Sequence, residues 1–185
     1  KYLLNIKIQK FINQQLDKPA ADLLFMANKY PDWDMAAIAQ QVVGKQKAKE
    51  KIPNWFNTNN LLYPVRLSME QCSSEETAKY KAKIMKGKQF IDLTGGFGVD
   101  TYFISHSFNK AIHCEVNKDL QYIAQHNFKT LGSDISSIHQ NGLEYLQTVL
   151  KKFDLIYVDP ARRDDNNQKV VMLSDYTPNI LEHID

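Results

Sequence analysis

Hydrophobic residues in the first half of the chain recur at the spacing of helix faces. Residues 4–16 place apolar side chains three and four positions apart, which predicts an amphipathic helix. Pro19 suits the first turn of a second helix, and Asp34 can cap a third helix that ends near Gly44. We therefore expect a helical N-terminal region over residues 1–86.

Two further patterns complete this helical region. Residues 54–60 are polar and rich in asparagine, which predicts a loop. Ser73 and Glu76 form a capping-box pattern ahead of another apolar helix face.

Residues 87–185 instead alternate short apolar runs with amphipathic segments. The expected strands are residues 89–93, 111–116, 135–139 and 153–158. The segments between them have helical spacing, and Asn117 can cap the one that carries Leu120 and Ile123. Such alternation predicts an α/β fold with a parallel, doubly wound sheet. The fourth run is almost wholly apolar, as a central parallel strand should be.

Composition and charge narrow the class of protein without selecting a partner. The chain has 185 residues, of which 43% are hydrophobic and 24% are charged, as in an ordinary globular protein. No apolar run approaches the ~20 residues that cross a membrane. The net charge of +2 permits a nucleic-acid partner without requiring one. Cys72 and Cys114 are too few for a disulfide framework or a zinc site, so we expect no metal and a cytoplasmic location.

The first chemical signal is a glycine turn between the first expected strand and the helix after it. Its candidate cofactor-binding residues are Asp92, Thr94, Gly95, Gly96, Phe97, Gly98 and Asp100. Glycine lets a backbone turn sharply and approach a ligand. Thr101 stands where a dinucleotide fingerprint has its third small residue, and an acid precedes the glycines. A carboxylate disfavours a pyrophosphate and suits the sulfonium and ammonium of S-adenosylmethionine (SAM). A tight turn without a ligand is the alternative.

Two residues on the following strands extend this candidate site. Glu115 ends the second strand, where a carboxylate can accept hydrogen bonds from both hydroxyls of a ribose. Its alternative role is to cap the next helix. Asn141 follows the third strand and can contact adenine, although a turn explains it equally well. His113 and Cys114 are expected to be packing residues.

The strongest signal is an Asp-Pro pair after the fourth strand. Pro160 lacks a backbone donor and restricts the turn, so Asp159 and nearby carbonyls can face the cleft and orient an amine or a base. Arg162 and Arg163 follow directly and can pair with phosphates. The alternative is a helix start with two surface arginines.

Together these motifs resemble the class I SAM-dependent methyltransferases, and more narrowly the bacterial THUMP-like methyltransferases. Residues 92–100, Glu115 and residues 159–163 carry the resemblance, which covers about residues 40 to 180. It implies a Rossmann-like SAM-binding domain over residues 87–185, with Asp92 or Asp100 near the methionine ammonium. It also implies that Asp159 and Pro160 stand where the methyl acceptor enters, and that the substrate is RNA.

Two departures from the class pattern shape these expectations. Thr94 occupies the position of the first glycine in the class motif, and only four of the seven expected strands can be placed. We therefore expect an incomplete sheet, truncated on its C-terminal side. Neither cysteine is near Asp159 in motif order, which favours methylation of a base nitrogen over carbon five of a pyrimidine. The alternatives are a small-molecule or protein methyltransferase, or a non-catalytic nucleic-acid-binding module with a degenerate SAM pocket.

The helical half offers one candidate nucleic-acid contact. Lysines alternate along one segment and precede two aromatic residues, a combination that suits phosphate contact and base stacking. The residues are Lys45, Lys47, Lys49, Lys51, Trp55 and Phe56. A solvated helix face is the alternative interpretation.

Overall fold

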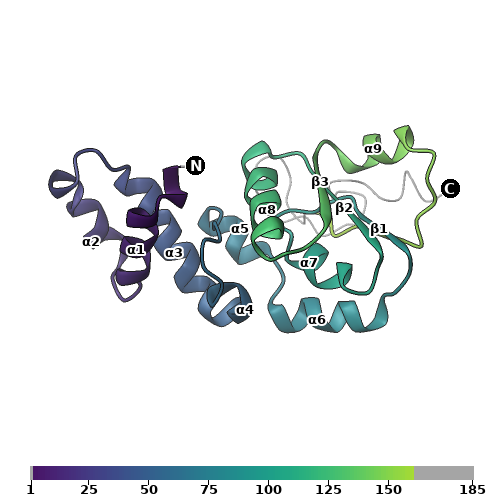
Figure 1. The fold of residues 1–185 in the computed structure, drawn as a ribbon, viewed down its shortest axis with the longest axis horizontal. Coiled ribbons are helices and arrows are strands. Elements are labelled where there is room, and N and C mark those ends of the chain that lie inside the picture. Colours follow the sequence, from purple (N-terminus) through teal and green to yellow (C-terminus); the bar gives the residue numbers. More distant parts are fainter. Residues whose placement is uncertain (1, 161–185) are drawn as a thin grey trace.

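The computed structural model describes residues 2–160, in which a helical N-terminal part leads into a sheet flanked by helices (Figure 1). Two short 3-10 turns, Tyr2–Leu4 and Ala27–Lys29, accompany the helices of the first half. These helices are α1 (Ile6–Gln14), α2 (Ala20–Phe25), α3 (Met35–Lys51), α4 (Pro53–Phe56), α5 (Arg66–Gln71) and α6 (Glu75–Ile84).

Four parallel strands form the sheet in the order β3-β2-β1-β4. The strands are β1 (Gln89–Asp92), β2 (Lys110–Glu115), β3 (Ile135–His139) and β4 (Leu155–Tyr157). The connecting helices are α7 (Val99–Ser105), α8 (Lys118–Thr130) and α9 (Gly142–Thr148). The chain winds outward from β1 to β3 and then returns to the other side of β1. The predicted α/β fold with a doubly wound parallel sheet is confirmed.

The helices cover both faces of this sheet (Figure 1). Side chains of α7 and α8 share one hydrophobic cluster, whereas Leu143 and Leu146 of α9 pack on Ile91 and Cys114 from the opposite face. The reversal of strand order falls between β1 and β4. In open α/β sheets the crevice outside the carboxyl ends of such strands is the usual ligand site.

Three local predictions for the helical region are wrong in detail. α3 does not end near Gly44 but continues to Lys51, so Gly44 lies inside the helix. The residue there is glycine because a Cβ would collide with Tyr63. Residues 54–60 are not all loop, since α4 buries Trp55 completely. The cap of α6 is Ser74, whose hydroxyl accepts from the Thr77 backbone, one residue after the predicted position.

Hydrophobic packing divides the chain within α3. One cluster joins α1, α2 and the first half of α3, from Ile8 to Val42. A second cluster joins Ala48, Trp55 and the start of α6 to side chains of α7 and α8. Residues 48–84 therefore pack with the sheet. The boundary near residue 86 stays a prediction.

Strand β4 is more exposed than the central strand that its apolar sequence predicts. Ile156 is 46% exposed, because β4 has one strand neighbour among residues 2–160 and lies at the end of the described sheet. Within the same residues, no helix combines the length and the apolar character needed to span a membrane.

Candidate functional site

The carboxyl ends of three strands bring the sequence-predicted residues together. The glycine turn follows β1, Glu115 ends β2, and Asp159 follows β4. Because β1 hydrogen-bonds to both β2 and β4, these three segments lie side by side at one edge of the sheet. This edge is the crevice at the reversal of strand order.

The glycine turn has a backbone that only glycine adopts readily. Gly96 and Gly98 have φ angles of 55° and 87°, in the left-handed region. At Gly96 an added Cβ would lie no closer than 3.8 Å to any neighbour, so one side of the turn is open. At Gly98 it would come within 2.5 Å of the Phe128 ring. Gly98 therefore lets α8 pack closely, whereas Gly96 leaves space above the turn.

Asp92 is enclosed beneath the turn and does not face the crevice. It is 1% exposed, and its two oxygens accept from the Thr94 backbone at 3.0 Å and the Thr101 hydroxyl at 2.6 Å. Burial raises the pKa of this carboxyl to about 7, although both hydrogen bonds oppose the shift. Asp92 thus supports the turn from below.

Glu115 connects the glycine turn to the start of α8. Its Oε2 accepts from the Gly96 backbone at 2.9 Å and its Oε1 from the Asn117 backbone at 2.6 Å. Asn117 itself caps α8, as predicted. A carboxylate has about four acceptor positions, so both oxygens keep capacity for a ligand hydroxyl.

Thr94, the departure from the glycine pattern, links the two principal motifs. Its hydroxyl oxygen accepts from the Asp159 backbone at 2.7 Å. A glycine could not make this bond. The Asp159 side chain remains 57% exposed at the same edge. Pro160 follows it, while Arg162 and Arg163 lie outside the described residues.

Asp100 lies in a polar network at the start of α7. Its Oδ2 accepts from the Ser73 hydroxyl at 2.8 Å, the Lys81 ammonium at 2.9 Å and the Tyr157 hydroxyl at 3.2 Å. Its Oδ1 is buried without a hydrogen-bond partner in residues 2–160. Such an acceptor is costly unless a donor reaches it.

Lys81 and Tyr157 were missed in the sequence. Lys81 also donates to the Tyr157 hydroxyl at 2.7 Å and lies 3.9 Å from an Asp159 oxygen. Burial and three nearby carboxylates raise the pKa of Tyr157, so it stays a neutral donor. The available signal was helical phase, since Lys81 follows Ala78 by three positions and interrupts the apolar face of α6.

Two of the predicted cofactor residues have structural partners. Phe97 is buried, with its ring 4.9 Å from that of Trp55, so only its backbone borders the crevice. The Asn141 side-chain oxygen caps α9 by accepting from Leu143 at 2.9 Å. The Asn141 amide nitrogen has no hydrogen-bond partner within residues 2–160, and its contact with adenine stays a prediction.

His113 and Cys114 pack beneath the site, as expected. His113 is fully buried, and burial lowers its pKa to about 4. Cys114 is also fully buried, and burial raises the pKa of its thiol to about 12. Cys72 is partly buried and its pKa is raised to about 11 for the same reason. None of these groups is an activated nucleophile.

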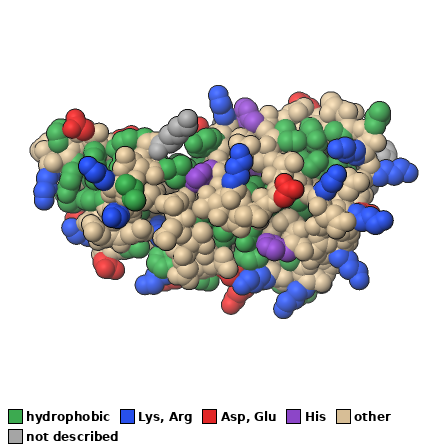
Figure 2. All heavy atoms as spheres, viewed as in Figure 1, with side chains coloured by type: hydrophobic (Ala, Val, Ile, Leu, Met, Phe, Trp, Pro, Cys, Tyr) green, Lys and Arg blue, Asp and Glu red, His purple; other side chains and the backbone are tan. Residues whose placement is uncertain are grey.

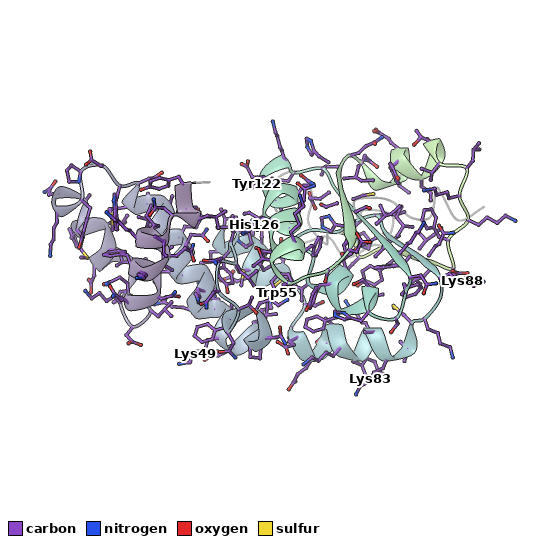
Figure 3. The ribbon with its side chains drawn as sticks, in the orientation of Figure 1. Lys49, Trp55, Lys83, Lys88, Tyr122 and His126 are labelled. Atoms are coloured by element: carbon purple, nitrogen blue, oxygen red, sulfur yellow. The ribbon has the colours of Figure 1, made fainter. Side chains whose placement is uncertain are left out.

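The lysines of α3 do not form the expected basic and aromatic surface. Lys45 is buried and donates to Asn13, Lys47 pairs with Glu70 at 3.2 Å, and Lys51 donates to the Glu70 backbone. Trp55 is 0% exposed and cannot stack on a base, although Lys49 is exposed (Figure 3). This segment is a packed helix with ion pairs, so the combined basic and stacking surface that the hypothesis of an RNA contact needed is not formed.

The residues at the edge fit SAM. Asp100, Glu115 and Asp159 surround the turn with negative charge, which suits a cationic ligand and opposes a pyrophosphate. The unpartnered Asp100 oxygen can accept from an ammonium, and the open side of Gly96 leaves room. Within residues 2–160, no three metal-ligating side chains are grouped to hold an ion.

The sheet and the segments at its carboxyl edge define the fold. A parallel sheet in this order, a glycine turn after β1 and an acid ending β2 are the fold of class I SAM-dependent methyltransferases. The narrower resemblance to the THUMP-like family stays a prediction, since no family model matches the chain.

Comparison with known proteins supports this class. Ribosomal RNA small subunit methyltransferase J of Francisella tularensis subsp. novicida (strain U112) is 29% identical over 116 residues, covering 57% of this chain and 46% of that protein. A crystal structure from Porphyromonas gingivalis W83, described as a "putative methyltransferase", is 30% identical with a TM-score of 0.79. It matches 95% of this chain and 44% of its own. The chain thus spans less than half the length of either protein.

Proposed function

We propose that this chain is the SAM-binding part of a methyltransferase that modifies a base nitrogen of RNA. The observation that carries the proposal is the bond between Thr94 and the Asp159 backbone. It holds the Asp-Pro motif against the glycine turn, so that a cofactor on the turn and an acceptor at Asp159 would be neighbours. Placing two reactants in this way can supply much of a rate enhancement.

The cofactor would be held by three sides of the crevice. Glu115 would accept from the ribose hydroxyls, and the Asn141 amide would face the adenine. The backbone from Thr94 to Gly98 and the free oxygen of Asp100 would receive the methionine part. Bound SAM supplies an electrophilic methyl group on its sulfonium.

Asp159 and Pro160 would orient the acceptor. The exposed Asp159 carboxylate can accept a hydrogen bond from a base amine, which turns the nitrogen lone pair toward the methyl group, and can take up the proton that is released. Pro160 restricts the backbone that carries this carboxylate. Methylation at carbon five would need a thiolate, and burial keeps both Cys72 and Cys114 protonated.

RNA as the substrate class draws on the similarity to a ribosomal RNA methyltransferase and on the basic pair after the Asp-Pro motif. Arg162 and Arg163 would contact phosphates, which arginine binds through two parallel hydrogen bonds. We also propose that the full-length protein belongs to the THUMP-like methyltransferases that the motifs resemble.

Calorimetric titration of SAM into the chain tests the cofactor site. We expect micromolar binding that Glu115→Ala weakens by roughly tenfold or more, because the ribose loses a charged acceptor and the turn loses its anchor. NAD should not bind. Glu50→Ala removes an exposed carboxylate of α3, far from the crevice, and should leave the affinity unchanged.

Two results would contradict the proposal. Equal SAM affinity in the parent and Glu115→Ala would remove Glu115 from the site. In the full-length protein, mass spectrometry of the RNA product showing a methyl group on a pyrimidine carbon would refute the base-nitrogen assignment.

A further inference from the structure

Charge is divided between the two edges of the sheet. Within residues 2–160, the carboxyl edge carries Asp100, Glu115 and Asp159 together with the cations Lys81 and Lys118, the latter at the start of α8. The opposite, amino edge carries exposed lysines at the end of α6 and at the starts of β1, β2 and β4. These are Lys83, Lys86, Lys88, Lys110, Lys151 and Lys152.

A backbone hydrogen bond holds two of these lysines side by side. The Lys110 backbone donates to the Lys88 carbonyl at 3.0 Å, since Lys110 begins β2 and Lys88 directly precedes the neighbouring strand β1. The Lys88 backbone donates to Asp154, which lies just ahead of β4. Lys83 and Lys88 project outward from this end of the molecule, where several cationic side chains gather, away from the N-terminal helices (Figures 2 and 3). We call these six lysines the amino-edge lysines.

Acidic neighbours compensate this charge only in part. Asp154 is exposed, and its carboxylate accepts from the backbone N–H groups of Lys88 and Gln89, which lower its pKa. Asp134 is exposed ahead of β3. No acidic side chain of residues 2–160 forms an ion pair with any of the six lysines. Among the residues that the structure describes, six cations thus face solvent beside these two carboxylates.

We propose that the amino-edge lysines bind the phosphate backbone of the RNA substrate away from the target nucleotide. This inference rests on the proposed RNA methyltransferase function. Asp100, Glu115 and Asp159 repel the phosphates of an RNA that approaches the carboxyl edge over a Debye length of roughly 10 Å, whereas Arg162 and Arg163 of the proposed function would attract them. Lysine contacts at the opposite edge offset that repulsion, because each one releases counterions from the RNA.

The separation of the two edges determines which substrates can use these lysines. β2 has six residues, and at about 3.3 Å per residue it spans roughly 20 Å. A phosphate at the amino edge is therefore several nucleotides from a base at Asp159. Long or structured RNA can contact both edges, whereas a short oligonucleotide reaches only one.

The test is the salt dependence of RNA binding by the chain and two triple variants. Lys86→Gln/Lys88→Gln/Lys110→Gln removes half of the amino-edge lysines. Lys7→Gln/Lys10→Gln/Lys18→Gln removes the same charge from exposed positions in the N-terminal part and serves as the matched control. The probes are single-stranded RNAs of about 20 and about 4 nucleotides, measured by fluorescence anisotropy in roughly 0.05–0.4 M salt.

We expect the amino-edge triple to weaken binding of the longer RNA on the order of 100-fold at ~0.1 M salt. The slope of log affinity against log salt should fall by about 2, from roughly 0.7 for each lost phosphate contact. The control triple should change affinity by less than about threefold, because its lysines lie far from both edges. In the parent, the 4-nucleotide RNA should bind more weakly than the longer RNA because it reaches only one edge, and SAM affinity should be the same in the parent and both triples.

Equal losses in the two triples would overturn the inference, since net charge alone would then explain binding, and the proposed RNA substrate would survive. A parent chain that binds SAM but no RNA at low salt would refute the RNA substrate and this inference together. Ile84 and Leu150 are exposed near the lysines, so anionic phosphatidylserine vesicles are a third probe. Vesicle binding that the amino-edge triple abolishes, with RNA affinity unchanged, would also overturn the inference.

Discussion

At the scale of single residues, Asp92 shows how a motif acid can serve the fold. Acids ahead of a glycine turn invite assignment as ligands, yet Asp92 is buried and both its oxygens have donors within the turn. The carboxylate loses hydration that two hydrogen bonds do not replace fully. Its effect on stability therefore depends on pH.

The direction follows from the raised pKa. Folding favours the protonated Asp92, whose pKa rises from 3.8 to about 7. The associated stability is present below about pH 4 and is lost as pH rises through about 7. Asp92→Asn keeps an acceptor for Thr94 and offers a donor to Thr101. We expect its unfolding free energy, measured in urea, to gain on that of the parent as pH rises from about 4 to 7.

Asp119→Asn is the control for this prediction. Asp119 is exposed in α8, so water solvates its carboxylate before and after unfolding. Over the same pH range its gain on the parent should stay well below that of Asp92→Asn. An Asp92→Asn chain that is less stable than the parent at every pH would mean that the ionised carboxylate stabilises the turn.

Thr94 and Lys81 show how far single residues of the site could be predicted from the sequence. Thr94 was visible as a departure from a glycine pattern, but its partner is a backbone N–H 65 positions later. Lys81 was visible only as a lysine on an apolar helix face. Its contacts with Asp100 and Tyr157 join three elements. Local sequence patterns do not predict contacts between elements that are distant in the chain.

At the scale of elements, close approach between α9 and β1 closes the crevice on one side. Gly142 begins α9, and a Cβ there would collide with the backbone of Leu93. Alanine is normally the better helix residue by about 1 kcal/mol, so sequence propensity alone favours Gly142→Ala. The contact reverses this preference.

We expect Gly142→Ala to lower the free energy of unfolding by about 2 kcal/mol, because backbone atoms on both sides must shift. Chemical denaturation measures this change. Glu144→Ala, an exposed position in the same helix, should remain within about 0.5 kcal/mol of the parent. A stabilised Gly142→Ala chain would show that α9 can move away from β1 without cost.

Element boundaries were predictable where caps are local. Asp34, Asn117 and the strand Ile135–His139 are placed as the sequence predicts. The end of α3 was misplaced because Gly44 looks like a helix terminator. Its glycine is required instead by Tyr63, a contact 19 positions away that no helix rule contains.

At the scale of the whole molecule, the helices after residue 48 support the site. Trp55 packs edge to face on Phe97 of the glycine turn and on Tyr102 of α7. Ile38 lies in the separate N-terminal cluster. A substitution that leaves a cavity at Trp55 should therefore loosen the packing of the glycine turn, whereas a cavity at Ile38 should leave the turn unchanged.

We expect Trp55→Leu and Ile38→Ala each to destabilise the chain by about 2–4 kcal/mol. At a temperature where both variants remain folded, calorimetry should find weaker SAM binding only for Trp55→Leu, since the wall behind Gly96 and Gly98 is loosened. Equal SAM affinities in the two variants would mean that the packing of Trp55 does not support the cofactor site.

The sequence by itself determined the α/β class, the parallel sheet and the residues at its carboxyl edge, because strand periodicity, glycine turns and caps depend on neighbours within a few positions. Tertiary structure alone decided that Asp92 is enclosed, that Lys81 meets Asp100, that the α3 lysines are paired or buried and that other lysines share the amino edge. These features join residues far apart in the chain. Burial and charge pairing depend on contacts made in the folded chain, and the local sequence pattern does not specify these contacts.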